Sequence, residues 1–275
     1  MIEKIYIARH GFRLNWINSV WTSPTGLERD PPLTAYGETQ AEELCQFFMS
    51  FPEEDRPTAI FSSPYYRCLQ TARPVAQALG LPIYVEHGIA EWYSPVVPGS
   101  GLHPRPGSTE SLKQHFAEVD PSWKTMYYPS RKGETVAELH NRIDTFLSAF
   151  VPVVLQRFPP EQHRRILFVT HAATTIALIH SFVGDRSLHL KAGCCSLSEL
   201  ERKTIEEGVG ETQVVGGWKP VSLVSGDHLQ GGSSREWGFE DIEVEKGRVV
   251  EDPGVPGTEN EPDAPVGLQK HTSNL

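Results

Sequence analysis

Histidine and arginine residues occur at three places in the chain where they could act together on a phosphoryl group. Arg9 and His10 directly follow an apolar run, and His171 directly follows a second one. Arg67 lies near the start of a segment with helical spacing. A phosphoryl group carries its charge on three oxygens, which planar guanidinium groups and histidine donors bind well. These residue types therefore predict a phosphate pocket.

His10 is the candidate nucleophile of this pocket. Neighbouring cations disfavour the imidazolium form, so we expect His10 to remain neutral near physiological pH. Gly11 has no side chain and lets the backbone approach the phosphate closely. An isolated Arg-His-Gly run is an ordinary surface turn in most proteins. The prediction therefore depends on Arg67 and His171 meeting it at one edge of a sheet.

The elements that must position these residues alternate between strands and helices. Short apolar runs predict strands at residues 5–8, 59–62, 82–85, 165–170 and 194–199. Helical spacing bounded by Thr, Pro or Gly predicts helices at residues 34–49, 64–79, 134–158 and 173–183. This alternation predicts an α/β fold, a three-layer sandwich with a mostly parallel central sheet and helices on both faces. Ligands bind at the carboxyl ends of strands in such sheets, where His10 and His171 both lie.

The motifs occur in the order that a known family shows. They are Arg9-His10-Gly11, Pro32-Leu33-Thr34 with Gly37 and Gln40-Ala41, Ser62-Ser63-Pro64 with Arg67 and Gln70-Thr71-Ala72, and Thr170-His171-Ala172. Over about residues 1–203 the chain resembles the histidine phosphatase, or phosphoglycerate mutase-like, superfamily. The resemblance implies that His10 is the phosphorylated nucleophile and that Arg9, Arg67 and His171 bind phosphate. Glu91, in Ala90-Glu91-Trp92, matches the family's acidic proton donor.

Two departures from the family pattern narrow the resemblance. Arg13 stands where mutases and many relatives have a small hydroxyl residue, and Ala172-Ala173 follows His171 where a Gly is common. The run 13–16 is similar to a subgroup that includes the Sts (UBASH3) protein tyrosine phosphatases. That subgroup also includes the phosphatase-like subunit of fungal transcription factor TFIIIC, which residues 170–174 and 226–237 resemble. Arg13 is then a further phosphate ligand; the alternative is an ion pair with Glu28 or Asp30.

Charge divides the chain into three parts. The formal net charge is -10, and residues 204–275 hold 14 Asp and Glu against 5 Lys and Arg. We expect a histidine phosphatase domain at 1–203, a C-terminal extension packing on or beside it at 204–247, and an acidic disordered tail at 248–275. An acidic chain lacks the basic stripe that direct nucleic-acid binding requires.

Several other classes of protein are disfavoured by the sequence. No apolar run approaches the roughly 18 residues of a membrane span, and the N-terminus shows no signal-peptide pattern. The four cysteines have no CxxC spacing, which fits a reducing compartment. We therefore expect an intracellular protein, nuclear or cytoplasmic. Paired metal-ligand spacings are absent from the sequence, and the expected reaction needs no metal or cofactor.

The favoured function is hydrolysis of phosphomonoesters through a phosphohistidine intermediate, with phosphotyrosine in a protein as the expected substrate. Aromatic residues that could line a pocket for an aryl leaving group are Trp16, Trp92, Tyr93, Tyr127 and Tyr128. The alternative is a non-catalytic or weakly catalytic interaction subunit of a TFIIIC-like RNA polymerase III transcription factor, with TFIIIC-like subunits as partners. A phosphoglycerate-type mutase is a third interpretation, which the Arg13 departure disfavours.

Overall fold

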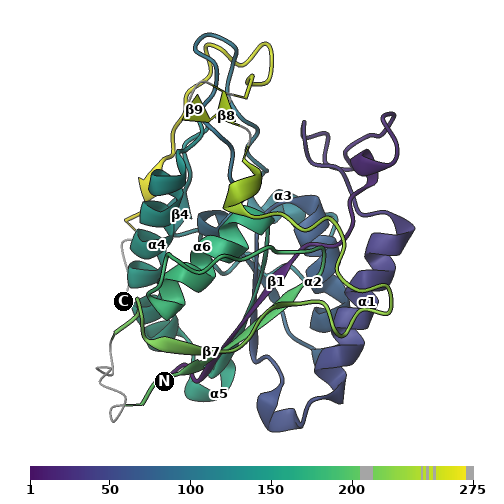
Figure 1. The fold of residues 1–275 in the computed structure, drawn as a ribbon, viewed down its shortest axis with the longest axis vertical. Coiled ribbons are helices and arrows are strands. Elements are labelled where there is room, and N and C mark those ends of the chain that lie inside the picture. Colours follow the sequence, from purple (N-terminus) through teal and green to yellow (C-terminus); the bar gives the residue numbers. More distant parts are fainter. Residues whose placement is uncertain (205–212, 243, 246–247, 250–251, 271–275) are drawn as a thin grey trace.

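The computed structural model describes residues 1–204, 213–242, 244–245, 248–249 and 252–270. Within these residues a six-stranded sheet forms the centre of the molecule (Figure 1), with the strand order β3-β2-β5-β1-β6-β7. Its strands are β1 (Lys4–Arg9), β2 (Ala59–Ser62), β3 (Ile83–Val85), β5 (Arg165–Thr170), β6 (Leu197–Arg202) and β7 (Trp218–Ser225). The first four are mutually parallel, β6 runs antiparallel to β1, and β7 runs antiparallel to β6.

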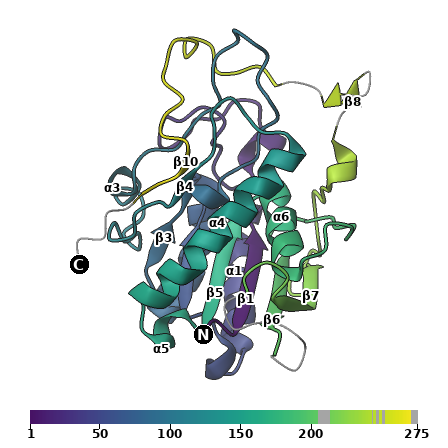
Figure 2. The ribbon, with the colours of Figure 1, turned by 90° about the vertical axis from the view of Figure 1, so that its left-hand side faces the viewer.

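Helices cover both faces of this sheet. The described α-helices are α1 (Ala35–Ser50), α2 (Tyr66–Leu79), α3 (Thr109–Leu112), α4 (Val136–Arg157), α5 (Pro160–His163) and α6 (Ala172–Val183). Figures 1 and 2 show α1 and α2 on one face and α4 and α6 on the other. The predicted three-layer α/β sandwich is therefore confirmed.

Strand β1 shows why the sheet needs helices on both sides. Successive strand residues point to opposite faces, so Ile5 and Ile7 join the core under α4 and α6, while Tyr6 and Ala8 join the core under α1 and α2. All four side chains are fully buried. A strand buried on both faces reads as a continuous apolar run, which is the pattern that predicted it.

Local capping residues fix where the helices begin and end. Thr34 accepts a hydrogen bond from the Gly37 N–H and so caps α1. Helix α4 begins with a capping box formed by Thr135 and Glu138. Helix α2 begins at Tyr66 and not at residue 64, because its first free N–H donates to the carboxylate of Asp30, which is distant in sequence. None of the described helices has the length and apolar composition needed to cross a bilayer.

The C-terminal part of the chain differs most from expectation. Strand β7 follows residue 203 and extends the central sheet, although its sequence gave no strand prediction. The tail was expected to be disordered from residue 248 onward, yet residues 252–270 lie along the domain. In the tail, β10 (Gly267–Leu268) pairs with β4 (Tyr127–Tyr128). Tail carboxylates accept hydrogen bonds from arginines elsewhere in the chain, as Asp252 does from Arg29 and Glu261 does from Arg131. Composition alone does not reveal such pairs.

Candidate active site

The candidate site lies at the carboxyl ends of three adjacent parallel strands. His10 directly follows β1, His171 directly follows β5, and Ser63 directly follows β2. The His10 and His171 rings are 5.3 Å apart between centroids. The structure thus brings together the two histidines that the sequence placed at strand ends, and Ser63 joins them.

The backbone fixes the orientation of the His10 ring. Its Nδ1 lies 2.8 Å from the carbonyl oxygen of Gly11. A carbonyl only accepts, so Nδ1 carries the proton and Nε2 keeps a free lone pair. Burial lowers the pKa of His10 well below its ordinary value, and the guanidinium groups of Arg67 and Arg9 lower it further. His10 is therefore a neutral imidazole with Nε2 available as a nucleophile.

Close packing against helix α1 requires a glycine at position 11. A Cβ at Gly11 would lie 2.6 Å from the carbonyl oxygen of Gly37 in α1. The Gly11 N–H also donates to Thr71 Oγ1 at 3.1 Å. The loop after His10 is consequently clamped between α1 and α2, which holds the histidine in place.

Arg67 is a fully buried cation at the base of the site. Its Nη1 donates to Asp30 Oδ1 at 3.1 Å, and its Nη2 donates to Glu91 Oε2 at 3.0 Å. The same Nη2 lies 3.2 Å from His171 Nδ1. A buried charge needs such partners to offset its desolvation. Asp30 therefore holds Arg67 in position; nothing in the spacing of the sequence indicated this role.

Arg9 and Arg13 flank His10 in different ways. Arg9 Nη1 donates to the carbonyls of Ala192 and Arg235 at 2.6 and 2.5 Å, so backbone groups orient it. The Arg13 guanidinium lies over the Trp16 ring, 4.5 Å from its centroid. Burial lowers the pKa of Arg13 to about 10, and it still remains charged at neutral pH.

Arg13 forms no ion pair with any carboxylate of the described residues. Asp30, one of the alternatives raised by the sequence, is bound to Arg67 instead. Arg13 is therefore a cation that faces the pocket without a carboxylate partner.

Glu91, His171 and Ser63 form a buried hydrogen-bonded chain. Glu91 Oε2 lies 3.2 Å from His171 Nδ1, and His171 Nε2 lies 2.7 Å from Ser63 Oγ. Burial favours a raised pKa for the Glu91 carboxyl, but contact with His171 and the charges of Arg67 and Arg13 hold it below its ordinary value. Burial lowers the pKa of His171 to about 4. Glu91 is thus an anion beside a neutral histidine.

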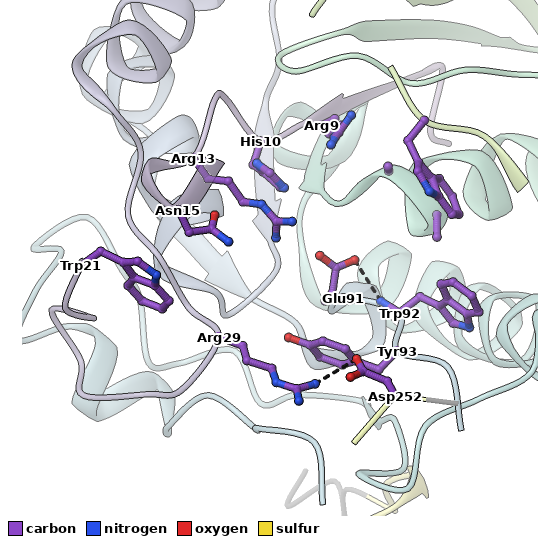
Figure 3. Close-up of a pocket in the computed structure, with 13 residues that line it drawn as sticks. Arg9, His10, Arg13, Asn15, Trp21, Arg29, Glu91, Trp92, Tyr93 and Asp252 are labelled. Carbon is purple, nitrogen blue, oxygen red and sulfur yellow. Dashed lines mark hydrogen bonds and ion pairs between the residues drawn. The ribbon is translucent and has the colours of Figure 1, made fainter. Parts of the chain in front are cut away.

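His10 and Glu91 line a cavity of about 420 Å³, whereas Arg67, His171 and Ser63 are fully buried and are not among its lining residues. Figure 3 shows Arg9, His10 and Arg13 on one side of it and Arg29, Tyr93 and Asp252 on the opposite side. The remaining lining residues are Asn15, Trp21, Glu91, Trp92, Ala172, Ala173 and Trp237. Of the five aromatic residues proposed from sequence, Trp92 and Tyr93 line the cavity. Sequence reasoning missed Arg29, Trp237 and Asp252, because they come from loops and the tail, where no spacing rule applies.

Charge favours an anion over a metal ion in this cavity. One ligand atom each from His10, Glu91 and His171 lie within 4.8 Å of one another, a spacing that could hold a cation. However, Arg9 and Arg13 line the same cavity, and Arg67 donates to Glu91. Several guanidinium groups around one carboxylate create a positive field that attracts phosphate.

Known proteins resemble this chain in sequence. Residues 5–210 match the model of the histidine phosphatase superfamily, branch 1, and the chain belongs to that family. It is 34% identical over 263 residues to the transcription factor tau 55 kDa subunit of Saccharomyces cerevisiae. It is also 26% identical over 257 residues to the ecdysteroid-phosphate phosphatase of Drosophila melanogaster. The matches cover 87% and 80% of this chain but only 59% and 32% of those proteins.

Solved structures show the same fold. The ecdysone phosphate phosphatase of Bombyx mori, in complex with tungstate, aligns with a TM-score of 0.59 and 18% identity, covering 81% of this chain and 93% of that one. A mycobacterial glucosyl-3-phosphoglycerate phosphatase aligns with a TM-score of 0.51 and 18% identity, covering 80% and 97%. At these identities the likeness concerns the fold.

Proposed function

We propose that this chain hydrolyses phosphomonoesters through a phosphohistidine formed on His10. One observation carries the proposal: His10 Nε2 is the free nitrogen of a neutral ring, and it lies in a cavity lined by Arg9 and Arg13. A nucleophile and a set of cations that suit the three phosphoryl oxygens are thus present in one place.

The reaction proceeds in two steps. The Nε2 lone pair of His10 attacks phosphorus, the N–P bond forms, and the bond to the ester oxygen breaks. Glu91, in its protonated form, donates a proton to the departing oxygen. In the second step Glu91 removes a proton from water, the water oxygen attacks phosphorus, and the N–P bond breaks to release phosphate. Arg9, Arg13, Arg67 and His171 stabilise the phosphoryl oxygens throughout.

The substrate class that we propose is an aryl phosphomonoester, with phosphotyrosine in a protein as the physiological form. Trp21, Trp92, Tyr93 and Trp237 line the cavity, so a phenyl leaving group finds aromatic partners there. A phenolate is also a better leaving group than an alkoxide, so it depends less on protonation.

Hydrolysis of para-nitrophenyl phosphate and of a phosphotyrosine peptide by the full chain tests this proposal. We expect turnover by the wild type and by a His189→Ala control, which alters an exposed histidine, and none by His10→Ala. A rapid acid-free quench with labelled substrate should trap one phosphoryl group per chain, and His10→Ala should trap none. Turnover that survives in His10→Ala contradicts the assignment.

A second candidate function is that of a subunit in a TFIIIC-like transcription factor. The observation that favours it is the 34% identity to the yeast tau 55 kDa subunit over 87% of this chain. We propose TFIIIC-like subunits as partners and the nucleus as the location, with residues beyond 203 making the partner contact. This function and hydrolysis are compatible.

Purification of the tagged full chain from its own cells tests the second function. We expect the same TFIIIC-like subunits to copurify with the wild type and with His10→Ala, because assembly does not require the nucleophile. If neither chain brings down such subunits, the proposal is wrong.

Phosphoryl transfer between glycerate phosphates should be undetectable, which separates hydrolysis from mutase activity.

A further inference from the structure

The far wall of the active-site cavity is an ion pair between two segments distant in sequence. Arg29 Nη1 lies 2.9 Å from Asp252 Oδ2, and both side chains line the cavity. Figure 3 shows the pair across the cavity from His10. Arg29 belongs to the loop between β1 and α1, whereas Asp252 belongs to the C-terminal tail. The side chains are 30% and 37% exposed, so the cavity and solvent both reach them.

The tail is anchored at Asp252 itself and again farther along the chain, so hydrogen bonds hold this wall of the cavity in place. The Val97 N–H donates to the Asp252 carbonyl at 3.2 Å, and the Asp252 N–H donates to the Pro95 carbonyl at 3.3 Å. Farther along, Asp263 accepts from Ser130 Oγ at 2.7 Å and from the Arg131 N–H at 2.6 Å. Backbone and side-chain hydrogen bonds therefore hold the tail against the loops that contain Pro95 and Ser130.

Arg29 makes further contacts besides the ion pair with Asp252, one of them with the tail. Its Nη2 donates to the Pro253 carbonyl, and its Nη1 lies 3.4 Å from His103 Nδ1. The Arg29 backbone has φ +58°, a left-handed conformation that an arginine rarely adopts. Left-handed backbone at a non-glycine residue persists only where surrounding contacts require it. The loop thus places a cation at the cavity wall, and the tail supplies the anion that neutralises it.

The two sides of the cavity consequently differ in charge. On the His10 side, Arg13 faces the cavity with no carboxylate partner among the described residues. On the far side, the charge of Arg29 is matched by Asp252. In an in-line attack the leaving group lies opposite the attacking nitrogen, so we expect it to face away from His10 and toward the Arg29–Asp252 pair across the cavity.

We propose that Asp252 is a specificity-determining residue that restricts the pocket to leaving groups without a second negative charge. The Asp252 carboxylate neutralises the Arg29 guanidinium group and repels a negatively charged group on the substrate. Loss of the Asp252 charge converts Arg29 into a second anion subsite for a substrate carboxylate or phosphate. This inference rests on the proposed phosphomonoesterase function for its meaning in catalysis, but the selectivity of binding can be measured without turnover.

The test compares two phosphonates that differ only in one charge, 4-carboxybenzylphosphonate and 4-carbamoylbenzylphosphonate, which cannot be hydrolysed. Titration calorimetry on the full chain gives the ratio of their dissociation constants. We expect the wild type to favour the carbamoyl compound. Asp252→Asn should shift the ratio toward the carboxylate by about threefold to fivefold, the effect of one partly exposed ion pair.

Two further variants identify the cause of such a shift. Asp227→Asn makes the same change in net charge at an exposed residue outside the cavity, and it should leave the ratio unchanged. Asp252→Asn combined with Arg29→Met should lose the gain, because the proposed subsite is then absent. An unchanged ratio in Asp252→Asn, or a gain that persists without Arg29, overturns the inference.

Turnover of the corresponding aryl phosphates separates this inference from the proposed function. A shift in the binding ratio with no hydrolysis by any variant contradicts the enzyme and leaves the selectivity of the pocket established. Hydrolysis with an unchanged ratio supports the enzyme and contradicts the role of Asp252. If neither phosphonate binds to any variant, the inference about Asp252 is wrong; if no aryl phosphate is hydrolysed either, the proposed function is wrong as well.

Discussion

Arg67 Nη2 donates a hydrogen bond of 3.0 Å to Glu91 Oε2 at the base of the cavity. This contact helps to keep Glu91 ionised, and an ionised carboxyl group has no proton to donate. A phosphate dianion bound beside Glu91 adds negative charge and competes for the guanidinium group of Arg67. Both effects raise the pKa of Glu91. Under the proposed function, we therefore expect substrate binding to favour the protonated form of Glu91, which can donate a proton.

The substitution Glu91→Gln should affect substrates according to their leaving groups. Gln keeps the shape of the side chain but transfers no proton, and general acid catalysis contributes about 10²–10⁴ in rate. We expect a loss in that range of kcat for an alkyl phosphomonoester and a much smaller loss for para-nitrophenyl phosphate, whose phenolate leaves without help. Steady-state kinetics on both substrates measures the difference. Equal losses on the two esters would show that Glu91 is not the acid.

Removing the charge of Arg13 should change the pH dependence of hydrolysis. Arg13 is one of the cations that lower the pKa of His10. Without it the imidazolium is less disfavoured, so the pKa of His10 rises and the neutral nucleophile is lost at a higher pH on acidification. The acid limb of kcat/KM should move to higher pH in Arg13→Met and stay near its wild-type position in Arg13→Lys.

The measurement for Arg13 is a pH–rate profile of the three proteins on para-nitrophenyl phosphate. KM should also rise in Arg13→Met, because one phosphate contact is lost. An acid limb that is identical in Arg13→Met and the wild type rules out electrostatic coupling between Arg13 and His10.

Local patterns in the sequence were sufficient to predict the sheet and the positions of its two histidines. His10 and His171 end buried strands, and a buried strand reads as an apolar run whatever surrounds it. Parallel strands place their carboxyl ends at one edge, so convergence of the two residues follows from topology. Arg67 lies near the start of the helix that follows β2, so its position predicted the same edge of the sheet, and the family resemblance gave the same assignment.

Long-range ion pairs could not be predicted in the same way. Asp30 binds Arg67 across 37 positions, and Asp252 binds Arg29 across 223. Each carboxylate looked like an ordinary loop residue in the sequence. The same holds for the tail, whose composition favours disorder, because its order depends on arginines elsewhere in the chain. Strand β7 lacked a buried apolar run, since its residues after Trp218 are partly or largely exposed at the edge of the sheet.

Asp30 should prove important for both stability and substrate binding. Its carboxylate is fully buried and accepts from Arg67 Nη1 and from the Tyr66 N–H. Asp30→Asn keeps the volume but leaves Arg67 with a single carboxylate partner, Glu91. Removing one partner of a buried ion pair costs about 3 kcal/mol in the free energy of unfolding.

Urea unfolding of Asp30→Asn and of the exposed control Asp227→Asn measures that cost. KM for para-nitrophenyl phosphate should rise in Asp30→Asn alone, because Arg67 is no longer held toward the cavity. A free energy of unfolding equal to that of the control means that Asp30 does not support Arg67.

The free energy of unfolding should fall in acid, and the buried side chain of His87 should account for part of that loss. His87 is buried, with Nδ1 2.9 Å from Thr125 Oγ1, and burial lowers its pKa from 6.5 to about 4. Between these values the unfolded chain binds a proton that the folded chain does not, so stability is complete above pH 6.5 and declines as the pH falls toward 4. At pH 5 this one group reduces the free energy of unfolding by about 2 kcal/mol.

His87→Gln removes the titration while keeping a polar side chain. The loss of unfolding free energy between pH 7 and pH 5 should therefore be smaller than in the wild type by about 2 kcal/mol. His189→Gln, at an exposed histidine, should retain the full wild-type loss. Urea unfolding at the two pH values gives all three differences. If His87→Gln declines as steeply as His189→Gln, the neutral state of the buried His87 ring does not contribute to the acid sensitivity of the fold.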